Sequence, residues 1–352
     1  MAKIKHILIC SPHVPFVKGG TEFLIDSLYE ELLKREYHVD RIIIPFQWHP
    51  KKEIIKNCMV WRLLDLARCE GKKVDLIIST KFPSYLIKHP NKVTYLIHQF
   101  RQVYDTYGTE YSNFTNTPED NKIKEMIVSM DNKFLPESKK IFTISKNVSN
   151  RLKQYNDLDS EVLYPPPRGH KNFYNQEYGD YMLYVGRLNR SKRVDLLIRS
   201  LTYTHRKVTC LIAGTGEEMI ALKNRVRELK LDDRVKLLGY VSDAELSELY
   251  ANCFGVFYAP YDEDYGFATV EAFLSRKPVI TTIDSGGARE FVEDGITGYV
   301  TINDPKSLAE KIDLLFLDKG LCRRLGNSGY EKVMDINISW DKVIERLTYP
   351  FS

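Results

Sequence analysis

Residues 258–272 read Tyr258-Ala259-Pro260-Tyr261-Asp262-Glu263-Asp264-Tyr265-Gly266-Phe267-Ala268-Thr269-Val270-Glu271-Ala272, and this is the most informative segment of the chain. Glu263 follows an apolar run typical of a buried strand, and Glu271 falls eight residues later, in the first turns of the next helix. Gly266 permits a tight turn between them, where the helix start exposes backbone N–H groups. Two carboxylates around one helix start can hold hydroxyls of a sugar or a ribose. They also serve simply as caps, so the stretch alone leaves both interpretations open.

Outward from this stretch, short β-branched and aromatic runs alternate with longer amphipathic segments along the whole chain. Such alternation predicts the α/β class, with parallel sheets covered on both faces by helices. Helical patterns include Thr21–Arg35 and Lys122–Asn132. The expected strands are Ile4–Cys10, Val39–Phe46, Asp75–Thr80, Val93–His98 and Ile141–Ser145, followed by Tyr181–Arg187, Val208–Gly214, Val235–Tyr240, Gly255–Pro260 and Pro278–Thr282.

A run of prolines, Pro165-Pro166-Pro167, breaks the alternation, because it can continue neither a helix nor a central strand. A chain of 352 residues also exceeds what one core usually supports. We therefore expect one domain over residues 1–165, a second over 166–337 and a terminal segment 338–352 that contains a helix near Trp340–Leu347. Both halves open with a strand, a glycine-bearing loop and a helix, so two similar domains would hold a ligand in a cleft between them.

Composition narrows the class of protein further. Hydrophobic residues at 43% and charged residues at 28% are typical of a folded globular chain. No stretch approaches the roughly 20 apolar residues of a membrane-spanning helix, and the first apolar run is too short for a signal peptide. The six cysteines include no Cys-x-x-Cys pair, which favours reduced thiols. These features predict a cytoplasmic protein.

The net charge of +4 is unevenly distributed. Residues 1–165 carry 25 Lys and Arg against 20 Asp and Glu, whereas the remainder carries 26 against 27. A mildly basic first half favours phosphate-bearing molecules and leaves room for peripheral contact with the inner membrane surface, or it is merely a solvated surface. No nucleic-acid partner is expected.

The Glu-x7-Glu arrangement of Glu263 and Glu271, with its aromatic-Gly-Phe insert, resembles the signature of the retaining glycosyltransferases of family four. Other matches occur in the family's order: Gly19-Gly20-Thr21-Glu22 resembles its Gly-Gly-x-Glu loop, Gly186-Arg187-Leu188 with Lys192 resembles its phosphate motif, and Asp294-Gly295-Ile296-Thr297-Gly298 resembles its turn after the sheet. The resemblance spans nearly the whole chain. It implies the GT-B fold, with two Rossmann-like domains facing across a cleft and a C-terminal helix that crosses back to the first domain.

The resemblance also implies roles for individual residues in binding a nucleotide-sugar donor. Arg187 and Lys192 would neutralise the donor diphosphate, which their chemistry supports independently, although each is otherwise an ordinary solvated cation. Glu263 would contact sugar hydroxyls and Glu271 the ribose. Backbone amides near the phosphates and the sugar would come from Gly19, Gly20, Gly266 and Phe267.

His98 ends an expected strand and matches the family's cleft histidine, although a lone histidine at a strand end is more often structural. The implied catalytic set is therefore Glu263, His98, Arg187 and Lys192. The resemblance implies front-face attack, in which the acceptor hydroxyl approaches from the leaving-group side and Glu263 positions the sugar.

The acceptor side is placed on the segment Gln99–Ser112, with Arg101, Tyr104 and Tyr107 as candidate contacts. Aromatic side chains beside a sugar site suit stacking on a pyranose or packing on a lipid tail. The same tyrosines would equally well form the core of their own loop, and the sequence leaves the two interpretations balanced.

Three other motifs give weaker evidence for a ligand site. Asp262-Glu263-Asp264 formally matches a metal–diphosphate motif of another transferase fold, but its overlap with the Glu-x7-Glu stretch argues against a metal. Gly214-Thr215-Gly216 resembles half a dinucleotide fingerprint, which Met219 spoils at the third glycine position. Ser285-Gly286-Gly287-Ala288 forms a glycine turn opening a helix. No metal and no cofactor are expected.

The function expected from the sequence is transfer of a hexose from a nucleotide diphosphate sugar to a glycan or lipid-linked acceptor. GDP-mannose is the first donor expectation and a UDP-sugar the second. A nucleotide-sugar epimerase of the same fold and a non-enzymic two-domain sugar-binding protein are the alternatives.

Overall fold

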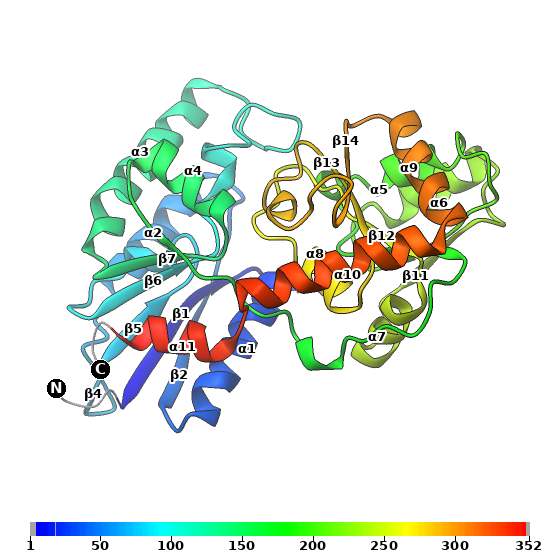
Figure 1. The fold of residues 1–352 in the computed structure, drawn as a ribbon. Coiled ribbons are helices and arrows are strands. Elements are labelled where there is room, and N and C mark those ends of the chain that lie inside the picture. The colour runs from blue at the N-terminus through cyan, green and yellow to red at the C-terminus, as the bar shows by residue number, and fades with distance from the viewer. Residues whose placement is uncertain (1–4, 18, 350–352) are drawn as a thin grey trace. The chain divides into compact units, whose positions relative to one another are not determined.

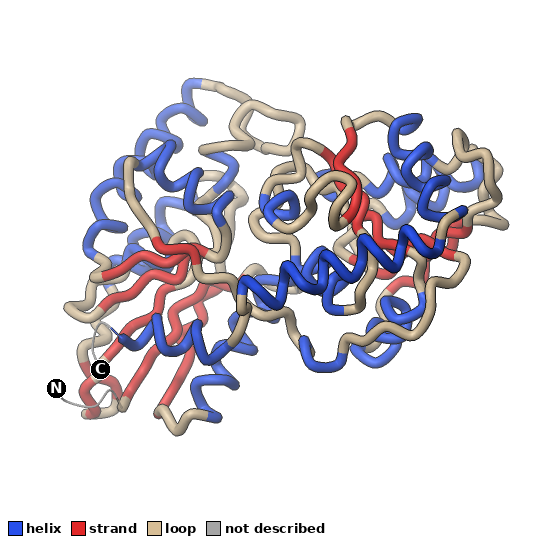
Figure 2. Tube along the Cα trace, viewed as in Figure 1, coloured by secondary structure: helices blue, strands red, loops and turns tan. Residues whose placement is uncertain are grey.

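The computed structural model describes residues 5–17 and 19–349, and the chain divides into two compact units (Figure 1). Unit 1 comprises Met1–Arg168 together with Ser339–Ser352, and unit 2 comprises Gly169–Ile338. The division falls just beyond the three prolines at which the sequence places a boundary. Each unit has its own group of strands with helices around it (Figure 2), so both are α/β folds of the expected kind.

Unit 1 is built on a six-stranded parallel sheet with the strand order β2-β1-β5-β6-β7-β8. β5 and β6 are buried along their whole length, as a parallel sheet covered on both faces requires. The strand expected over Ile4–Cys10 begins outside the described residues, and within them β1 continues to His13. The strands are β1 (His6–His13), β2 (His38–Pro45), β5 (Leu76–Ser79), β6 (Lys92–Leu96), β7 (Lys140–Thr143) and β8 (Glu161–Val162).

Helices connect these strands. α3 is longer at both ends than the expected Lys122–Asn132, because Thr117 caps it by accepting from the backbone N–H of Asp120 at 3.2 Å and Pro118 occupies its first position. The helices of this part of the chain are α1 (Gly20–Lys34), α2 (Lys52–Leu63), α3 (Pro118–Phe134) and α4 (Lys146–Asn156), with short 3-10 turns η1 (Ser84–Leu86), η2 (Arg101–Val103) and η3 (Leu135–Glu137) and a small hairpin of β3 (Arg68–Cys69) and β4 (Lys72–Lys73).

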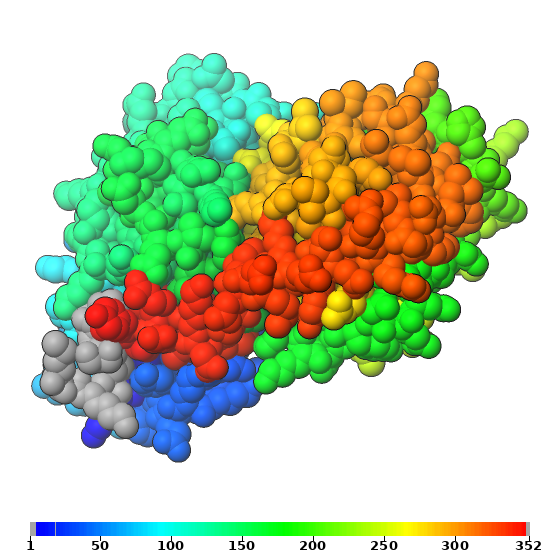
Figure 3. All heavy atoms as spheres, viewed as in Figure 1, coloured from blue at the N-terminus to red at the C-terminus, as the bar shows by residue number. Residues whose placement is uncertain are grey.

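The end of the described chain completes unit 1. After unit 2, α11 (Trp340–Thr348) packs on α1, and Figure 3 shows these last residues in red against the blue of the first helix and strands. Arg35 on α1 pairs with Asp341, and Arg346 donates to Glu161 on β8 at 2.6 and 2.8 Å. The C-terminal helix therefore belongs to unit 1.

Unit 2 is built on a second six-stranded parallel sheet, with the order β11-β10-β9-β12-β13-β14. The strands are β9 (Tyr181–Val185), β10 (Thr209–Ala213), β11 (Val235–Gly239), β12 (Gly255–Phe257), β13 (Val279–Thr282) and β14 (Gly298–Thr301). The helical segments are η4 (His170–Asn172), η5 (Arg190–Lys192), α5 (Val194–Ser200), α6 (Met219–Glu228), α7 (Asp243–Asn252), α8 (Phe267–Leu274), η6 (Gly287–Glu290), α9 (Pro305–Leu317) and α10 (Lys319–Ile336).

Candidate functional site

The order of strands reverses in unit 2 between β9 and β12, which are neighbours in the sheet but not in the sequence. In open parallel sheets, ligands bind beyond the carboxyl ends of the strands at such a reversal. The loops that follow β9 and β12 carry four of the residues to which the sequence assigns the donor: Arg187 and Lys192 after β9, and Glu263 and Gly266 after β12. The strand order therefore brings both motifs to one edge of one sheet.

The loop after β9 is shaped by close backbone packing. A Cβ added to Gly214 would lie 1.9 Å from the carbonyl oxygen of Gly186, and one added to Gly216 would lie 2.2 Å from that of Leu188. The half-fingerprint Gly214-Thr215-Gly216 thus lets the neighbouring loop lie against it, which accounts for its glycines without a dinucleotide. Arg187 follows on this loop with an exposed side chain, and its carbonyl oxygen accepts from the Tyr184 hydroxyl at 3.0 Å.

Lys192 joins the two loops. Its ammonium group donates to Glu263 Oε2 and lies 3.3 Å from the Tyr258 hydroxyl oxygen, so the expected phosphate ligand and the expected sugar ligand are ion-paired. Lys192 lies in the 3-10 turn η5, where the Asn189 side chain accepts from the backbone N–H of Lys192 at 3.2 Å. The arrangement presents ammonium donors and carboxylate acceptors at one place.

Arg193 holds the loop after β12 in position. Its guanidinium is buried and donates to the carbonyl oxygens of Ala259 at 2.9 Å and Pro260 at 2.7 Å. It also makes a two-pronged bond with Asp284, at 2.8 Å to each carboxylate oxygen. Sequence reasoning missed this residue because one arginine among several basic neighbours carries no local signal of burial.

Gly266 starts α8 with a φ of 91°, a conformation that favours glycine. The first residue of the helix is Phe267, so the backbone N–H groups of the first turn follow the glycine directly. Glu271 is the fifth residue of α8, within the first turns of the helix as expected. Its half-buried carboxylate accepts from the Tyr250 hydroxyl at 2.8 Å.

The environment of Glu271 changes its acidity. The pKa of this carboxyl is raised to about 7, chiefly by burial; the hydrogen bond from Tyr250 opposes this rise, and the nearby carboxylate of Asp243 adds a smaller upward contribution. A group with a pKa near 7 exists in both protonation states under ordinary conditions. The hydrogen-bonding capacity of Glu271 toward a hydroxyl therefore depends on pH.

The glycine turn Ser285-Gly286-Gly287-Ala288 packs against the loop that follows β12 and opens the 3-10 turn η6. The N–H of Gly287 donates to the carbonyl oxygen of Glu263 at 2.7 Å, and a Cβ at this position would lie 2.5 Å from the carbonyl oxygen of Asp264. These two contacts of Gly287 fix the backbone that carries Glu263. The turn Asp294–Gly298 leads into β14, whose first residue is Gly298. A Cβ added to Gly298 would lie 2.0 Å from the carbonyl oxygen of Val279, so this position also needs a glycine.

Unit 1 carries the other predicted residues. Gly19 is the N-cap of α1 and provides no side-chain cap, and Gly20 is the first residue of that helix. His98 lies two residues beyond β6, not at its end, and its Nδ1 is 2.7 Å from the Gln99 carbonyl oxygen. Because a carbonyl oxygen only accepts, Nδ1 is the donor in this hydrogen bond.

The three candidate acceptor contacts are engaged within unit 1. Arg101 pairs with Asp105 at 2.5 Å. Tyr104 is buried and donates to Asp131 at 2.7 Å, so it belongs to the core of its own unit. The Tyr107 hydroxyl donates to Asn121. Of the two interpretations left open by the sequence, this packing favours a loop core, most clearly for Tyr104.

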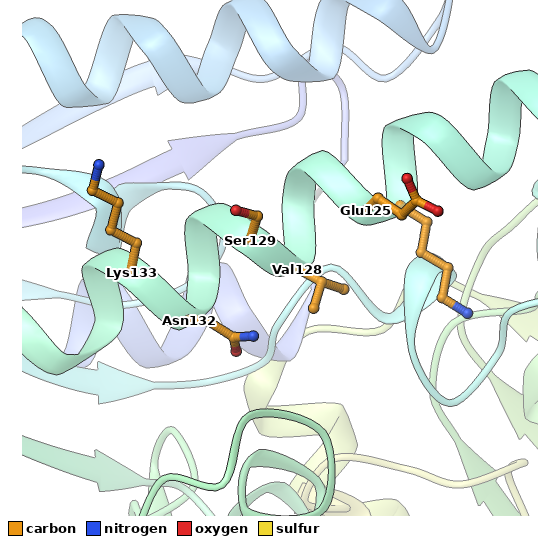
Figure 4. Close-up of a pocket in the computed structure, with 6 residues that line it drawn as sticks. Glu125, Val128, Ser129, Asn132 and Lys133 are labelled. Carbon is orange, nitrogen blue, oxygen red and sulfur yellow. The ribbon is translucent and has the colours of Figure 1, made fainter.

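A shallow hollow lies along the outer surface of α3, where Lys124, Glu125, Val128, Ser129, Asn132 and Lys133 line it. The labelled side chains spread along the helix and do not converge on one point (Figure 4). None of them is a predicted site residue, and we assign no ligand to this surface.

Within 5–17 and 19–349, no group of three or more His, Cys, Asp or Glu side chains is placed to hold a metal ion, including around Asp262-Glu263-Asp264. Over the same ranges, no helix is both long enough and apolar enough to cross a membrane.

Comparisons with known proteins agree with this geometry. Residues 170–332 match the family model described as glycosyl transferases group 1. The chain is 30% identical over 217 residues to an uncharacterized glycosyltransferase of Methanocaldococcus jannaschii, covering 59% of this chain and 57% of that protein. It is 24% identical over 218 residues to human alpha-1,3/1,6-mannosyltransferase ALG2, covering 52% and 50%. The chain thus matches little more than half the length of these relatives.

A solved structure shares the fold over nearly the whole chain. HepE of Anabaena, in complex with UDP and glucose, superposes with a TM-score of 0.71 at 18% identity, covering 98% of this chain and 100% of HepE. The two parallel-sheet units are therefore those of the GT-B fold. The family match covers almost all of unit 2, including the loops that carry Lys192 and Glu263. The chain therefore has the GT-B fold, and residues 170–332 of it are similar to the glycosyl transferases group 1.

Proposed function

We propose that this protein is a retaining, metal-independent glycosyltransferase that moves a hexose from a nucleotide diphosphate sugar to a glycan or lipid-linked acceptor. The observation that carries the proposal is the ion pair of Lys192 with Glu263 at the β9/β12 strand reversal of a group 1 glycosyltransferase domain. GDP-mannose is the first donor candidate, supported by the similarity to a mannosyltransferase, and a UDP-sugar is the second, supported by the HepE complex.

In this proposal, donor binding replaces the internal pairing of Lys192. The ammonium group turns from Glu263 to the donor diphosphate, with Arg187 as the second cation, and the released carboxylate accepts hydrogen bonds from sugar hydroxyls. Glu271 holds the ribose, and the backbone N–H groups after Gly266 face the sugar and phosphate. Cations at the diphosphate stabilise the negative charge that develops as the bond to the sugar breaks.

The chemical step proposed is attack from the same face as the leaving group. The acceptor hydroxyl oxygen forms a bond to the anomeric carbon as the bond from that carbon to the diphosphate oxygen breaks. The hydroxyl proton passes to the departing diphosphate oxygen, so no enzymic nucleophile is needed. Glu263 acts by positioning the sugar, and His98 in unit 1 is proposed to approach it.

A thermal-shift panel tests the proposal. GDP, UDP, dTDP and their sugars are compared with EDTA present, since binding to the folded state stabilises it by an amount that grows with the logarithm of ligand concentration over dissociation constant. We expect one nucleotide to raise the melting temperature selectively and Lys192→Ala to abolish the shift. Arg190→Ala, an exposed cation on the same turn, is the matched control. No shift with any nucleotide, even with Mg²⁺ restored, would refute the transferase function in favour of a sugar-binding protein.

The proposed retention of anomeric configuration has its own test. Proton NMR of the newly formed glycoside shows the anomeric configuration before any equilibration. The same configuration as in the donor is expected, and an inverted product would overturn the retaining mechanism while leaving the transferase activity intact.

A further inference from the structure

Tyr258 is a buried residue of unit 2 to which the sequence assigns no role in the site. It follows β12 directly, and its backbone N–H donates to the carbonyl oxygen of Ile280 on β13 at 2.9 Å. The residue is only 5% exposed. It begins the loop that connects β12 to α8, both of which are labelled in Figure 1. Because β12 borders the strand reversal of this sheet, Tyr258 lies at the carboxyl edge where a ligand would bind.

Residues assigned to the donor surround this side chain. The ammonium group of Lys192 donates to the Tyr258 hydroxyl oxygen at 3.3 Å while it also pairs with Glu263. A Cβ added to Gly266 would lie 3.2 Å from Cε1 of the ring, so the ring packs against the start of α8. One buried side chain therefore connects the residue expected at the diphosphate with the loop expected at the sugar.

The hydroxyl of Tyr258 remains protonated at ordinary pH. Burial raises the pKa of this hydroxyl well above its usual value, and the negative charge of Glu263 and a hydrogen bond to the same carboxylate raise it as well. A tyrosine hydroxyl accepts and donates at the same time. Its oxygen thus accepts from Lys192, and its proton is available to Glu263.

We propose that Tyr258 is a positioning residue that acts through Glu263 on the sugar of the donor. When Lys192 turns to the diphosphate, the carboxylate of Glu263 loses its cation and faces a group of like charge. The Tyr258 hydroxyl then holds this carboxylate by a hydrogen bond, which keeps it directed at the sugar hydroxyls. The inference rests on the proposed transferase function and adds a residue by which the site distinguishes a nucleotide sugar from the nucleotide alone.

Isothermal titration of the full chain tests this role. GDP and GDP-mannose are the first pair of ligands, and UDP and UDP-glucose are the second. The quantity compared is the Kd of the nucleotide sugar divided by the Kd of the nucleotide, because effects on Lys192 are common to both ligands and cancel. Tyr258→Phe should raise this ratio by about tenfold or more, the effect typical of one lost hydrogen bond to a charged group.

A double-mutant cycle determines whether the hydroxyl acts through Glu263. In a Glu263→Ala background, Tyr258→Phe should no longer change the ratio, because the carboxylate that it positions is gone. Tyr258→Phe keeps the ring, and Lys192 and Glu263 still pair with each other at 16% and 22% exposure, so the variant leaves no buried charge without a partner.

Tyr181→Phe is the matched control. It also removes a tyrosine hydroxyl from unit 2, one that donates to the carbonyl oxygen of Leu249 at 2.8 Å, and Tyr181 lies at the opposite end of β9 from the donor loops. The melting temperature should fall by a similar amount in both variants. The ratio of dissociation constants should change only in Tyr258→Phe.

The outcomes separate the inference from the function on which it rests. An unchanged ratio in Tyr258→Phe, or equal weakening of the nucleotide and its sugar, would reduce Tyr258 to a packing residue. An increase that persists in the Glu263→Ala background would refute the action through Glu263. In each of these cases the nucleotide still binds and the transferase function stands, whereas a wild-type chain that binds no nucleotide would overturn the function itself.

Discussion

The Tyr250 hydroxyl lies 2.8 Å from Oε2 of Glu271, and it opposes the burial that raises the pKa of this carboxyl to about 7. A ribose hydroxyl donates most strongly to the ionised carboxylate. We therefore expect nucleotide affinity to increase as pH rises through about 7, because the fraction of ionised Glu271 increases. Isothermal titration of the stabilising nucleotide at several pH values measures this, and Glu271→Gln should flatten the profile.

Tyr250→Phe tests the cause of that pH dependence. Without the hydroxyl, the ionised carboxylate loses a hydrogen bond, so the pKa of Glu271 should rise further and the midpoint of the affinity profile should move to higher pH. A midpoint that stays in place, or moves to lower pH, would contradict the role assigned to this hydrogen bond.

Arg193 should contribute more to stability than its neighbours on the sequence. Arg193→Met leaves the carbonyl oxygens of Ala259 and Pro260 without their buried donor, and each buried acceptor left unsatisfied typically costs about 1–3 kcal/mol. Arg190→Met, an exposed position three residues earlier, should cost less than about 0.5 kcal/mol. Urea denaturation of both variants provides the comparison, and equal losses would show that the Arg193 bonds contribute little.

Gly214 should tolerate no side chain. Gly214→Ala places a Cβ 1.9 Å from the carbonyl oxygen of Gly186, so the loop that leads to Arg187 must move. Gly239→Ala is the matched control, because Gly239 also has a positive φ but nothing lies within 4 Å of an added Cβ. Nucleotide binding and melting temperature should fall much further in the first variant, and similar effects in both would indicate that backbone strain alone matters.

Asp131 should make stability depend on pH. It is fully buried, burial raises its pKa to about 7, and the folded state therefore retains a proton that the unfolded chain releases near pH 4. This contribution to the free energy of unfolding is complete below about pH 4 and is lost as pH rises to about 7, by at most about 4 kcal/mol. Denaturation at pH 5 and pH 8 should show a smaller difference for Asp131→Asn than for the wild type, and equal differences would argue against this protonation.

The sequence predicted the strands of both sheets well, because each parallel strand is a short apolar run buried on both faces. The predicted ends of the elements were less accurate. The strand expected over Gly255–Pro260 ends at Phe257, because the carbonyl oxygens of the next residues bond to Arg193, which is 66 residues before Ala259 in the sequence. The strands β8 and β14 were missed, and β8 has only two residues.

The candidate site was predictable where a motif is local. Gly266 and Glu271 are recognisable because the turn and the helix belong to one continuous stretch. The pair Lys192–Glu263 joins residues far apart in the sequence, so it follows only from the strand order. Tyr104 could not be assigned from the sequence, because an aromatic residue beside an expected site can face either the ligand or the core. Its hydrogen bond to Asp131 places it in the core.

The path of the chain through α11 means that unit 2 is an insertion within unit 1. Unit 1 needs Ser339–Ser352 to be whole, since Val343 and Leu347 on α11 are buried. Unit 2 can therefore be excised as one continuous segment, Gly169–Ile338, whereas isolating unit 1 requires a new linker from Arg168 to Ser339. A protease that cuts the chain once near Arg168 would leave the two units covalently joined through the other crossing.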